Sequence, residues 1–154
     1  MQQSQEDARF SICLLEDERK RLLFIKRSTS DAIGPGKWGF PAGHIESGES
    51  PMECALREMN EEIGPEHKIS KLNILGPVRD TFYGGKFEIH LFHFRWISGE
   101  VVLNDEHTEF AWVAANEFAG LDTMLGIEED IVLLDIWPSA MFNQSRLPST
   151  LLGD

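Results

Sequence analysis

Three glutamates crowd into five residues of this 154-residue chain, directly after an arginine, within residues 43–64. The acids are Glu58, Glu61 and Glu62, and Arg57 precedes them. Carboxylates this close together repel one another unless a cation binds beside them. Carboxylate oxygens gathered on one face suit a hard cation such as Mg²⁺ or Mn²⁺. An ordinary solvated helix face, with charges paired at i, i+4 spacing, is the alternative that these residues alone leave open.

The sequence around these acids predicts a helix over residues 51–63. Ser50 and Glu53 fit a capping box, Pro51 suits the first helical position, and Gly64 suits the stop. At about 100° per residue, the three acids fall within an arc of about 100°. A neighbouring arc carries Met52, Ala55, Leu56, Met59 and Ile63. We therefore expect the apolar arc to face a core and the acids to line the edge of a cleft.

The loop before this helix favours a metal site over a solvated face. Gly43, then Glu49, then the run from Arg57 to Gly64 resembles, residue by residue and at the same spacing, the signature of the Nudix hydrolases. We call the segment Gly43 to Pro65 the Nudix box. Pro65 departs from the family, which usually has an aliphatic residue there, and we expect it to redirect only the helix exit. The resemblance extends at the fold level over about residues 8–140.

Composition is that of one enzyme domain spanning residues 1–154. The net charge of −12 argues against binding long nucleic acid, which needs a basic surface. No apolar run suggests a membrane span, and the N-terminal residues lack signal-peptide character. Cys13 and Cys54 are expected to be buried thiols, so we expect a cytoplasmic protein.

Strand and helix patterns alternate along the chain and predict the α/β class. The expected strands are residues 8–16, 21–27, 69–83 (one or two strands, broken near Gly76-Pro77), 86–97 and 109–114. Both faces of residues 86–97 are apolar, which predicts a central strand. A short helix should begin at residues 116–118, and a C-terminal helix should cover residues 128–137. This order predicts a mixed β-sheet between helices, the α/β/α sandwich of the Nudix fold.

The resemblance implies a role for each charged residue of the box. Glu58, Glu61 and Glu62 are the implied metal ligands, with the Ala42 carbonyl as a further ligand and Glu49 as an additional carboxylate at the edge of the site. Arg57 would orient a carboxylate through its forked guanidinium rather than contact the substrate.

The general base and the substrate contacts lie outside the box. In many family members a loop and strand like residues 103–113 supply the base, so Glu106 is the first candidate and Glu109 the second. A structural hydrogen bond at a strand edge is the alternative for Glu109. The candidates for substrate binding are Arg27, Lys37, Arg79 and Tyr83.

These residues predict a metal-dependent hydrolase that cleaves the P–O–P linkage of a small nucleoside diphosphate derivative, such as a nucleoside triphosphate or a nucleotide sugar, by water attack at phosphorus. Two alternatives are a non-catalytic nucleotide-sensing Nudix domain and an isoprenoid diphosphate isomerase. The sensor would usually have lost box carboxylates, and the isomerase would need a cysteine in its pocket. The sequence is compatible with a homodimer as well as with a monomer.

Overall fold

A computed structural model describes residues 8–32 and 34–151. Its strands are β1 (Arg9–Glu16), β2 (Leu22–Arg27), β3 (Trp38–Gly39), β4 (Ala42–His44), β5 (His67–Arg79), β6 (Glu88–Gly99) and β7 (His107–Val113). Its α-helices are α1 (Pro51–Ile63) and α2 (Ile127–Leu133). Shorter 3₁₀ turns cover Ala115–Gly120, Ser139–Met141, Gln144–Arg146 and Ser149–Leu151. The expectation that the N-terminus lacks signal-peptide character concerns residues 1–7 among others, and these residues lie outside the described part of the chain.

The strands form one mixed sheet, which confirms the predicted α/β class. Its order is β3-β2-β1-β6-β5, with β4 also paired to β1 and β7 also paired to β2. The β1–β6 pair is parallel and the other pairs are antiparallel. β4 places Ala42 opposite Ile12 and Gly43 opposite Ser11, so the beginning of the Nudix box is fixed to a central strand.

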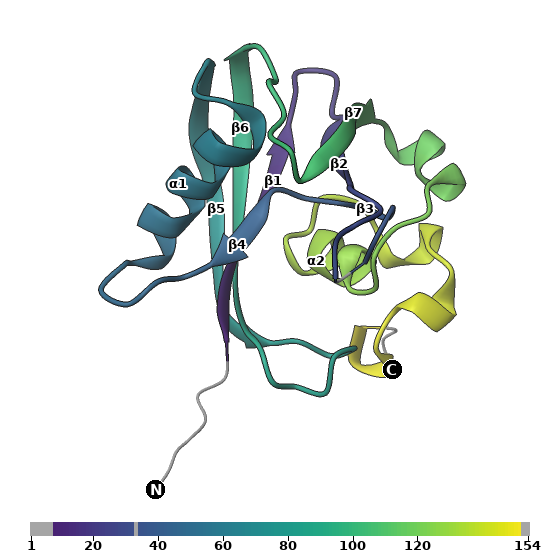
Figure 1. Cartoon of the computed structure of the whole chain (residues 1–154). Helices are drawn as coiled ribbons and strands as arrows, with labels where there is room; N and C mark the ends of the chain where they lie inside the picture. Colours follow the sequence, from purple (N-terminus) through teal and green to yellow (C-terminus); the bar gives the residue numbers. More distant parts are fainter. Residues whose placement is uncertain (1–7, 33, 152–154) are drawn as a thin grey trace, which may run out of the picture.

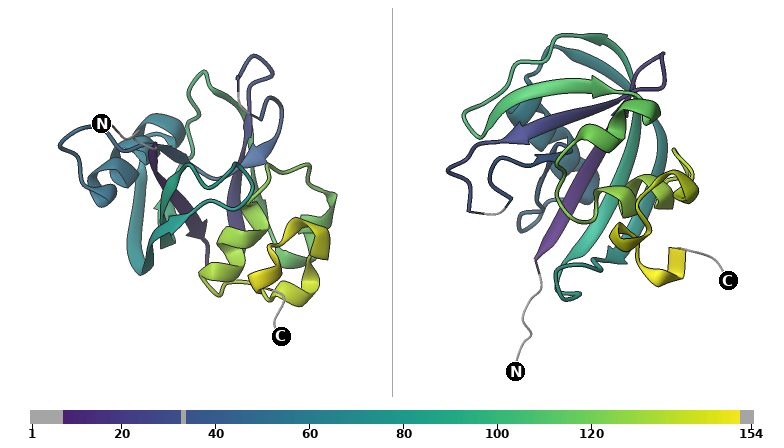
Figure 2. Two further views of the ribbon diagram at one scale, coloured as in Figure 1. Left: turned by 90° about the horizontal axis from the view of Figure 1, so that it is seen from below. Right: turned by 90° about the vertical axis from the view of Figure 1, so that its right-hand side faces the viewer.

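Two hydrophobic clusters lie on opposite faces of this sheet. α1 covers one face, whereas α2 and the C-terminal turns cover the other (Figure 1). The views from below and from the side show the same separation (Figure 2). β6 contributes Ile89 and Leu91 to one cluster and Phe92 and Phe94 to the other, as its two apolar faces predicted. The sandwich expected from the sequence is therefore confirmed.

The helix α1 has the predicted bounds and the predicted cap. Ser50 Oγ accepts a hydrogen bond from the Glu53 backbone N–H at 3.0 Å, and the Glu53 side chain accepts one from the Ser50 N–H at 2.9 Å. The buried face of α1, however, lies closer to the acidic residues than the sequence predicted. Cys54 and Glu62 are buried, whereas Leu56 is 43% exposed, so its assignment to the core-facing arc was wrong.

Two other segments, β5 and α2, differ most from their expected bounds. β5 is one continuous strand that begins at His67. Its pairing with β6 shifts register between Leu75 and Val78, which flank Gly76 and Pro77. α2 ends at Leu133 because Asp135 has a φ of 58°, a left-handed conformation that turns the chain out of the helix. Trp137 then enters the core instead of extending the helix.

The chain continues to pack beyond residue 140. Phe142 and Leu147 are buried in the same cluster as α2, so the C-terminal turns belong to the core. Within the described residues, no helix has the length and apolar character needed to cross a membrane.

Arg146 fastens these C-terminal turns to the segment that precedes α2. Its Nε donates to Glu128 Oε2 at 2.8 Å, and its Nη2 donates to the Thr123 hydroxyl at 2.9 Å and to the Thr123 and Met124 carbonyls at 3.0 Å. Glu128 is only 4% exposed, and its Oε1 has no hydrogen-bond partner among the described residues. Arg146 is therefore the cation that compensates a buried carboxylate.

Replacing Arg146 with alanine should destabilise the fold strongly, because Glu128 would stay buried without its cation. Losing one partner of a buried ion pair costs about 3–5 kcal/mol, and urea denaturation would measure the change. The control is Arg95→Ala at an exposed position of β6, where we expect a change within about 0.5 kcal/mol. Equal midpoints for the two variants would contradict this role of Arg146.

Candidate active site

The first turns of α1 lie against β4 because the strand has a glycine there. A Cβ atom at Gly43 would overlap the carboxylate of Glu58. The helix and the strand can therefore approach only if residue 43 has no side chain. This contact places the Glu58 carboxylate directly beside β4.

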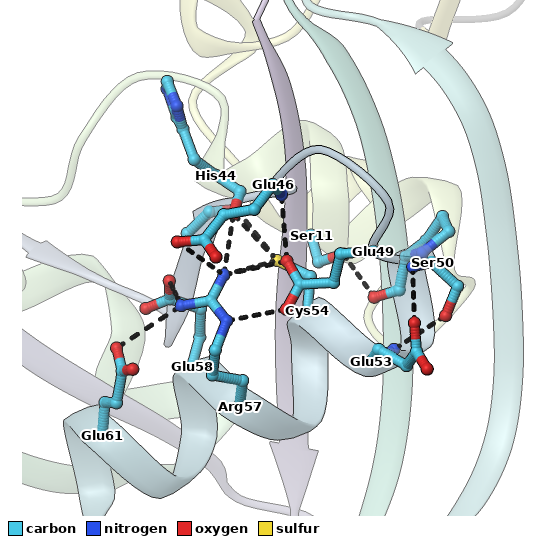
Figure 3. Close-up of polar contacts among 12 residues, drawn as sticks. Ser11, His44, Glu46, Glu49, Ser50, Glu53, Cys54, Arg57, Glu58 and Glu61 are labelled. Atoms are coloured by element: carbon cyan, nitrogen blue, oxygen red, sulfur yellow. Dashed lines mark hydrogen bonds and ion pairs between the residues drawn. The ribbon is translucent and has the colours of Figure 1, made fainter.

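Arg57 lies among the acids of the box (Figure 3). Its guanidinium binds Glu49 through two hydrogen bonds, Nε to Oε2 at 2.7 Å and Nη2 to Oε1 at 3.0 Å. Nη1 donates to Glu58 Oε2 at 2.7 Å and lies 3.5 Å from Glu61 Oε1. Nη2 also donates to the His44 carbonyl at 3.0 Å. One planar cation thus orients three carboxylates and the loop before the helix.

The pKa values of the carboxyl groups at the two ends of this acidic cluster shift in opposite directions. The hydrogen bonds from Arg57, with help from the Glu46 backbone N–H, lower the pKa of Glu49 to about 2. Burial, together with the neighbouring Glu58, raises the pKa of Glu62 well above its usual range. The Ala42 N–H opposes this shift by donating to Glu62 Oε1 at 3.1 Å. Added positive charge beside Glu62 would therefore favour its ionised form.

The chemistry of these donors fits a hard divalent cation. Glu58, Glu61 and Glu62 offer only oxygen atoms, and the buried Glu62 is the carboxylate that would gain most from added positive charge. In the part of the chain that the structure describes, no group of three acidic, histidine or cysteine side chains converges as a metal site. Glu58 and Glu61 contact Arg57 instead, and Glu61 is 54% exposed at its side chain.

The two candidate bases lie in different surroundings. Glu106 is exposed in the loop before β7, and its charge contributes to the raised pKa of Glu62. Its backbone carbonyl accepts a hydrogen bond from the Ser28 N–H, which attaches the loop to the end of β2. Glu109 lies within β7, is 59% exposed at its side chain, and pairs with Lys26 across the strands at 3.5 Å. The surroundings favour Glu106 as the base.

A cavity of about 200 Å³ opens beside the box, and Ala42 lines it. Arg27, Arg79 and Tyr83 also line this cavity, so three of the four substrate-binding candidates lie together. Lys37 does not belong to this lining, because its Nζ pairs with Asp122 at 2.8 Å. The backbone of Lys37 nevertheless lies beside Arg27, whose N–H donates to the Lys37 carbonyl at 2.9 Å, so only the Lys37 side chain points to another partner.

Sequence reasoning missed several acids that lie near these sites. Glu46 lies 3.8 Å from Arg57, and Glu129 and Asp130 line the cavity from α2. The sequence signal of Glu129 and Asp130 is weak, because acids are common in the first turn of any helix. Only the packing of α2 against the sheet distinguishes them from ordinary surface acids.

Both cysteines are buried and free, as predicted. The Cys54 thiol donates to the Gly43 and His44 carbonyls, at 3.5 and 3.3 Å, and thus supports the β4 loop. Burial raises the pKa of both thiols. Neither cysteine lines the cavity.

Comparison with known proteins agrees with this geometry. The NUDIX domain family matches residues 6–134. The nucleoside triphosphatase NudI of Escherichia fergusonii is 28% identical over 131 residues, which cover 79% of this chain and 93% of that protein. NudI of Salmonella arizonae is 29% identical over 120 residues, covering 72% and 85%.

Solved structures show the same fold. The MutT protein from Methanosarcina mazei Go1 is 26% identical with a TM-score of 0.69, covering 85% of this chain and 95% of that chain. A C. elegans Ap4A hydrolase, at 15% identity and a TM-score of 0.65 over 82% of this chain and 94% of its own, shares the fold alone. The chain therefore belongs to the Nudix hydrolase family and is a Nudix-type pyrophosphohydrolase.

Proposed function

We propose that this enzyme cleaves the P–O–P linkage of a nucleoside diphosphate derivative, with Mg²⁺ or Mn²⁺ held by Glu58, Glu61 and Glu62. Nudix hydrolases generally use divalent metal ions. One observation carries the proposal: Ala42 donates its N–H to Glu62 and also lines the cavity. A nucleotide bound in that cavity would thus have its phosphates beside the box carboxylates.

Nucleoside triphosphates are the first substrates to test. The NudI relatives are named nucleoside triphosphatases, and their similarity extends over most of this chain. Nucleotide sugars are the next class. The net charge of −12 disfavours long nucleic acid, because phosphate backbones require a basic surface.

The proposed mechanism is direct attack of water on phosphorus. A bound divalent cation would neutralise charge on the phosphate oxygens. Arg57 keeps Glu49 and Glu58 in fixed orientations, and the Ala42 carbonyl and Glu49 are the further metal contacts that we propose. Glu106 would accept the proton of the attacking water, while Arg27 and Arg79 would contact phosphate and Tyr83 the nucleoside.

The structure gives less support to the two other functions. An isomerase would need a cysteine in the pocket, whereas Cys13 and Cys54 are buried away from the cavity. A sensor domain would tolerate loss of the box acids, and this chain retains all of them. Glu61 and Glu106 therefore provide direct tests of catalysis.

Replacing Glu61 with glutamine should lower kcat by about 10²- to 10³-fold, which is typical for losing one preorganised electrostatic group. The fold should survive, because Glu61 is exposed and the change removes a like charge. Steady-state turnover at saturating Mg²⁺ would measure the effect, with Glu66→Gln at an exposed position as the control. Near-normal turnover by the Glu61 variant would refute its role as a metal ligand.

Glutamine at position 106 should lower kcat by about 10²- to 10⁴-fold, the range of general base catalysis. The same change at Glu109 should cost little, because that side chain pairs with Lys26 at the surface. Comparing kcat for Glu106→Gln and Glu109→Gln separates the two candidates. A larger loss for the Glu109 variant would reverse our assignment.

Alanine at position 43 should disable the enzyme without unfolding it, because the added Cβ displaces the Glu58 carboxylate. A misplacement of about 1 Å can cost about 10²-fold in rate. Gly120→Ala is the matched control, since a Cβ there meets no atom within 4 Å. We would abandon this role for Gly43 if kcat/KM were equal for the two variants.

A further inference from the structure

The cavity beside the Nudix box has the size and the walls of a site for one flat ring system. Its volume of about 200 Å³ lies below the range of about 300–1,000 Å³ that holds a whole drug-sized ligand. Five aromatic residues contribute to its lining, namely Phe10, Phe40, Phe82, Tyr83 and Phe87. Such walls suit the faces of a nucleobase.

The aromatic wall is held in place by Asp80. Its carboxylate accepts hydrogen bonds from the backbone N–H groups of Tyr83 and Phe87, both at 2.7 Å. The Tyr83 hydroxyl then donates to the Leu125 carbonyl at 3.2 Å, which connects the loop after β5 to the residues before α2. The cavity is therefore formed before any ligand binds.

Two carboxylates enter this lining from α2, on a helix that contributes apolar side chains such as Ile127 and Leu133 to the same wall. Glu129 Oε2 accepts a hydrogen bond from the Thr81 hydroxyl at 2.8 Å. Among the described residues, no hydrogen-bond donor reaches the Asp130 carboxylate, although Asp130 lines the cavity. Burial, together with the charges of Glu129 and Glu128, raises the pKa of Asp130. Asp130 is half-buried, so a ligand that supplies a hydrogen-bond donor would stabilise its carboxyl group.

We propose that Asp130 selects nucleotides whose base carries an exocyclic amino group, by accepting a hydrogen bond from that amine inside the cavity. The inference rests on the proposed function and adds a base preference to it. A carboxyl oxygen accepts from an N–H donor whether the acid is neutral or ionised. Guanine, adenine and cytosine offer that amine, whereas hypoxanthine and uracil present a hydrogen or a carbonyl oxygen at the corresponding position.

The test is kcat/KM for matched nucleotide pairs. GTP and ITP differ only in the 2-amino group, and CTP and UTP provide a pyrimidine pair. We expect the wild-type enzyme to favour the amine-bearing member of at least one pair by about 10-fold, because the other member leaves the half-buried Asp130 carboxyl without a donor. Asp130→Leu should bring that ratio close to one, and Asp130→Asn, which keeps one acceptor oxygen, should retain part of it.

Two controls separate this inference from the proposed function. Asp135→Asn makes the same chemical change at an exposed position outside the cavity and should leave the ratio unchanged. Circular dichroism and thermal unfolding of Asp130→Leu should show a folded protein, so that a changed ratio reports base selection and not loss of structure.

Four results would overturn the assignment. Equal wild-type rates on both members of every pair would refute the base preference while leaving the hydrolase function intact. A preference that survives Asp130→Leu would place the selecting group elsewhere. If Asp130→Leu instead changed the ratio of kcat/KM for ATP to that for dATP, Asp130 would contact the sugar and not the base. Failure of the wild type to hydrolyse any nucleotide would overturn the proposed function as well.

Discussion

Repulsion among like charges is the constraint on which the active site depends. Glu49, Glu58 and Glu61 all contact a single cation, Arg57, while burial and the neighbouring Glu58 raise the pKa of Glu62. One guanidinium leaves this acidic cluster with a net negative charge. A divalent cation bound by these carboxylates, as proposed above, would supply the missing positive charge.

The rest of the fold serves to hold this cluster against a cavity. β4 pairs with β1 in the centre of the sheet, and the missing side chain of Gly43 lets α1 approach that strand. On the other face, Arg146 fastens the C-terminal turns to the segment before α2, which forms part of the cavity wall. The carboxylates and the cavity thus belong to different layers of the sandwich and meet at Ala42.

Local signals predicted α1 well, because Ser50, Glu53 and Gly64 determine its ends through contacts between neighbours in sequence. The same reasoning failed where tertiary packing decides. α2 stops early because Asp135 adopts a left-handed conformation, and Leu56 is exposed because packing turned the buried face of α1 toward Glu62. Asp130 carried no sequence signal, since its position in the cavity depends on how α2 packs against the sheet.

Hydrolysis by metal-depleted enzyme in ¹⁸O-labelled water tests the central claim most directly. With nucleoside triphosphates and nucleotide sugars as substrates, we predict no turnover until Mg²⁺ or Mn²⁺ is added. Mass spectrometry should then find ¹⁸O in a phosphorus-containing product, because water attacks phosphorus. Turnover that is unaffected by metal depletion, or ¹⁸O attached to carbon in the released sugar, would contradict a metal-dependent attack at the P–O–P linkage.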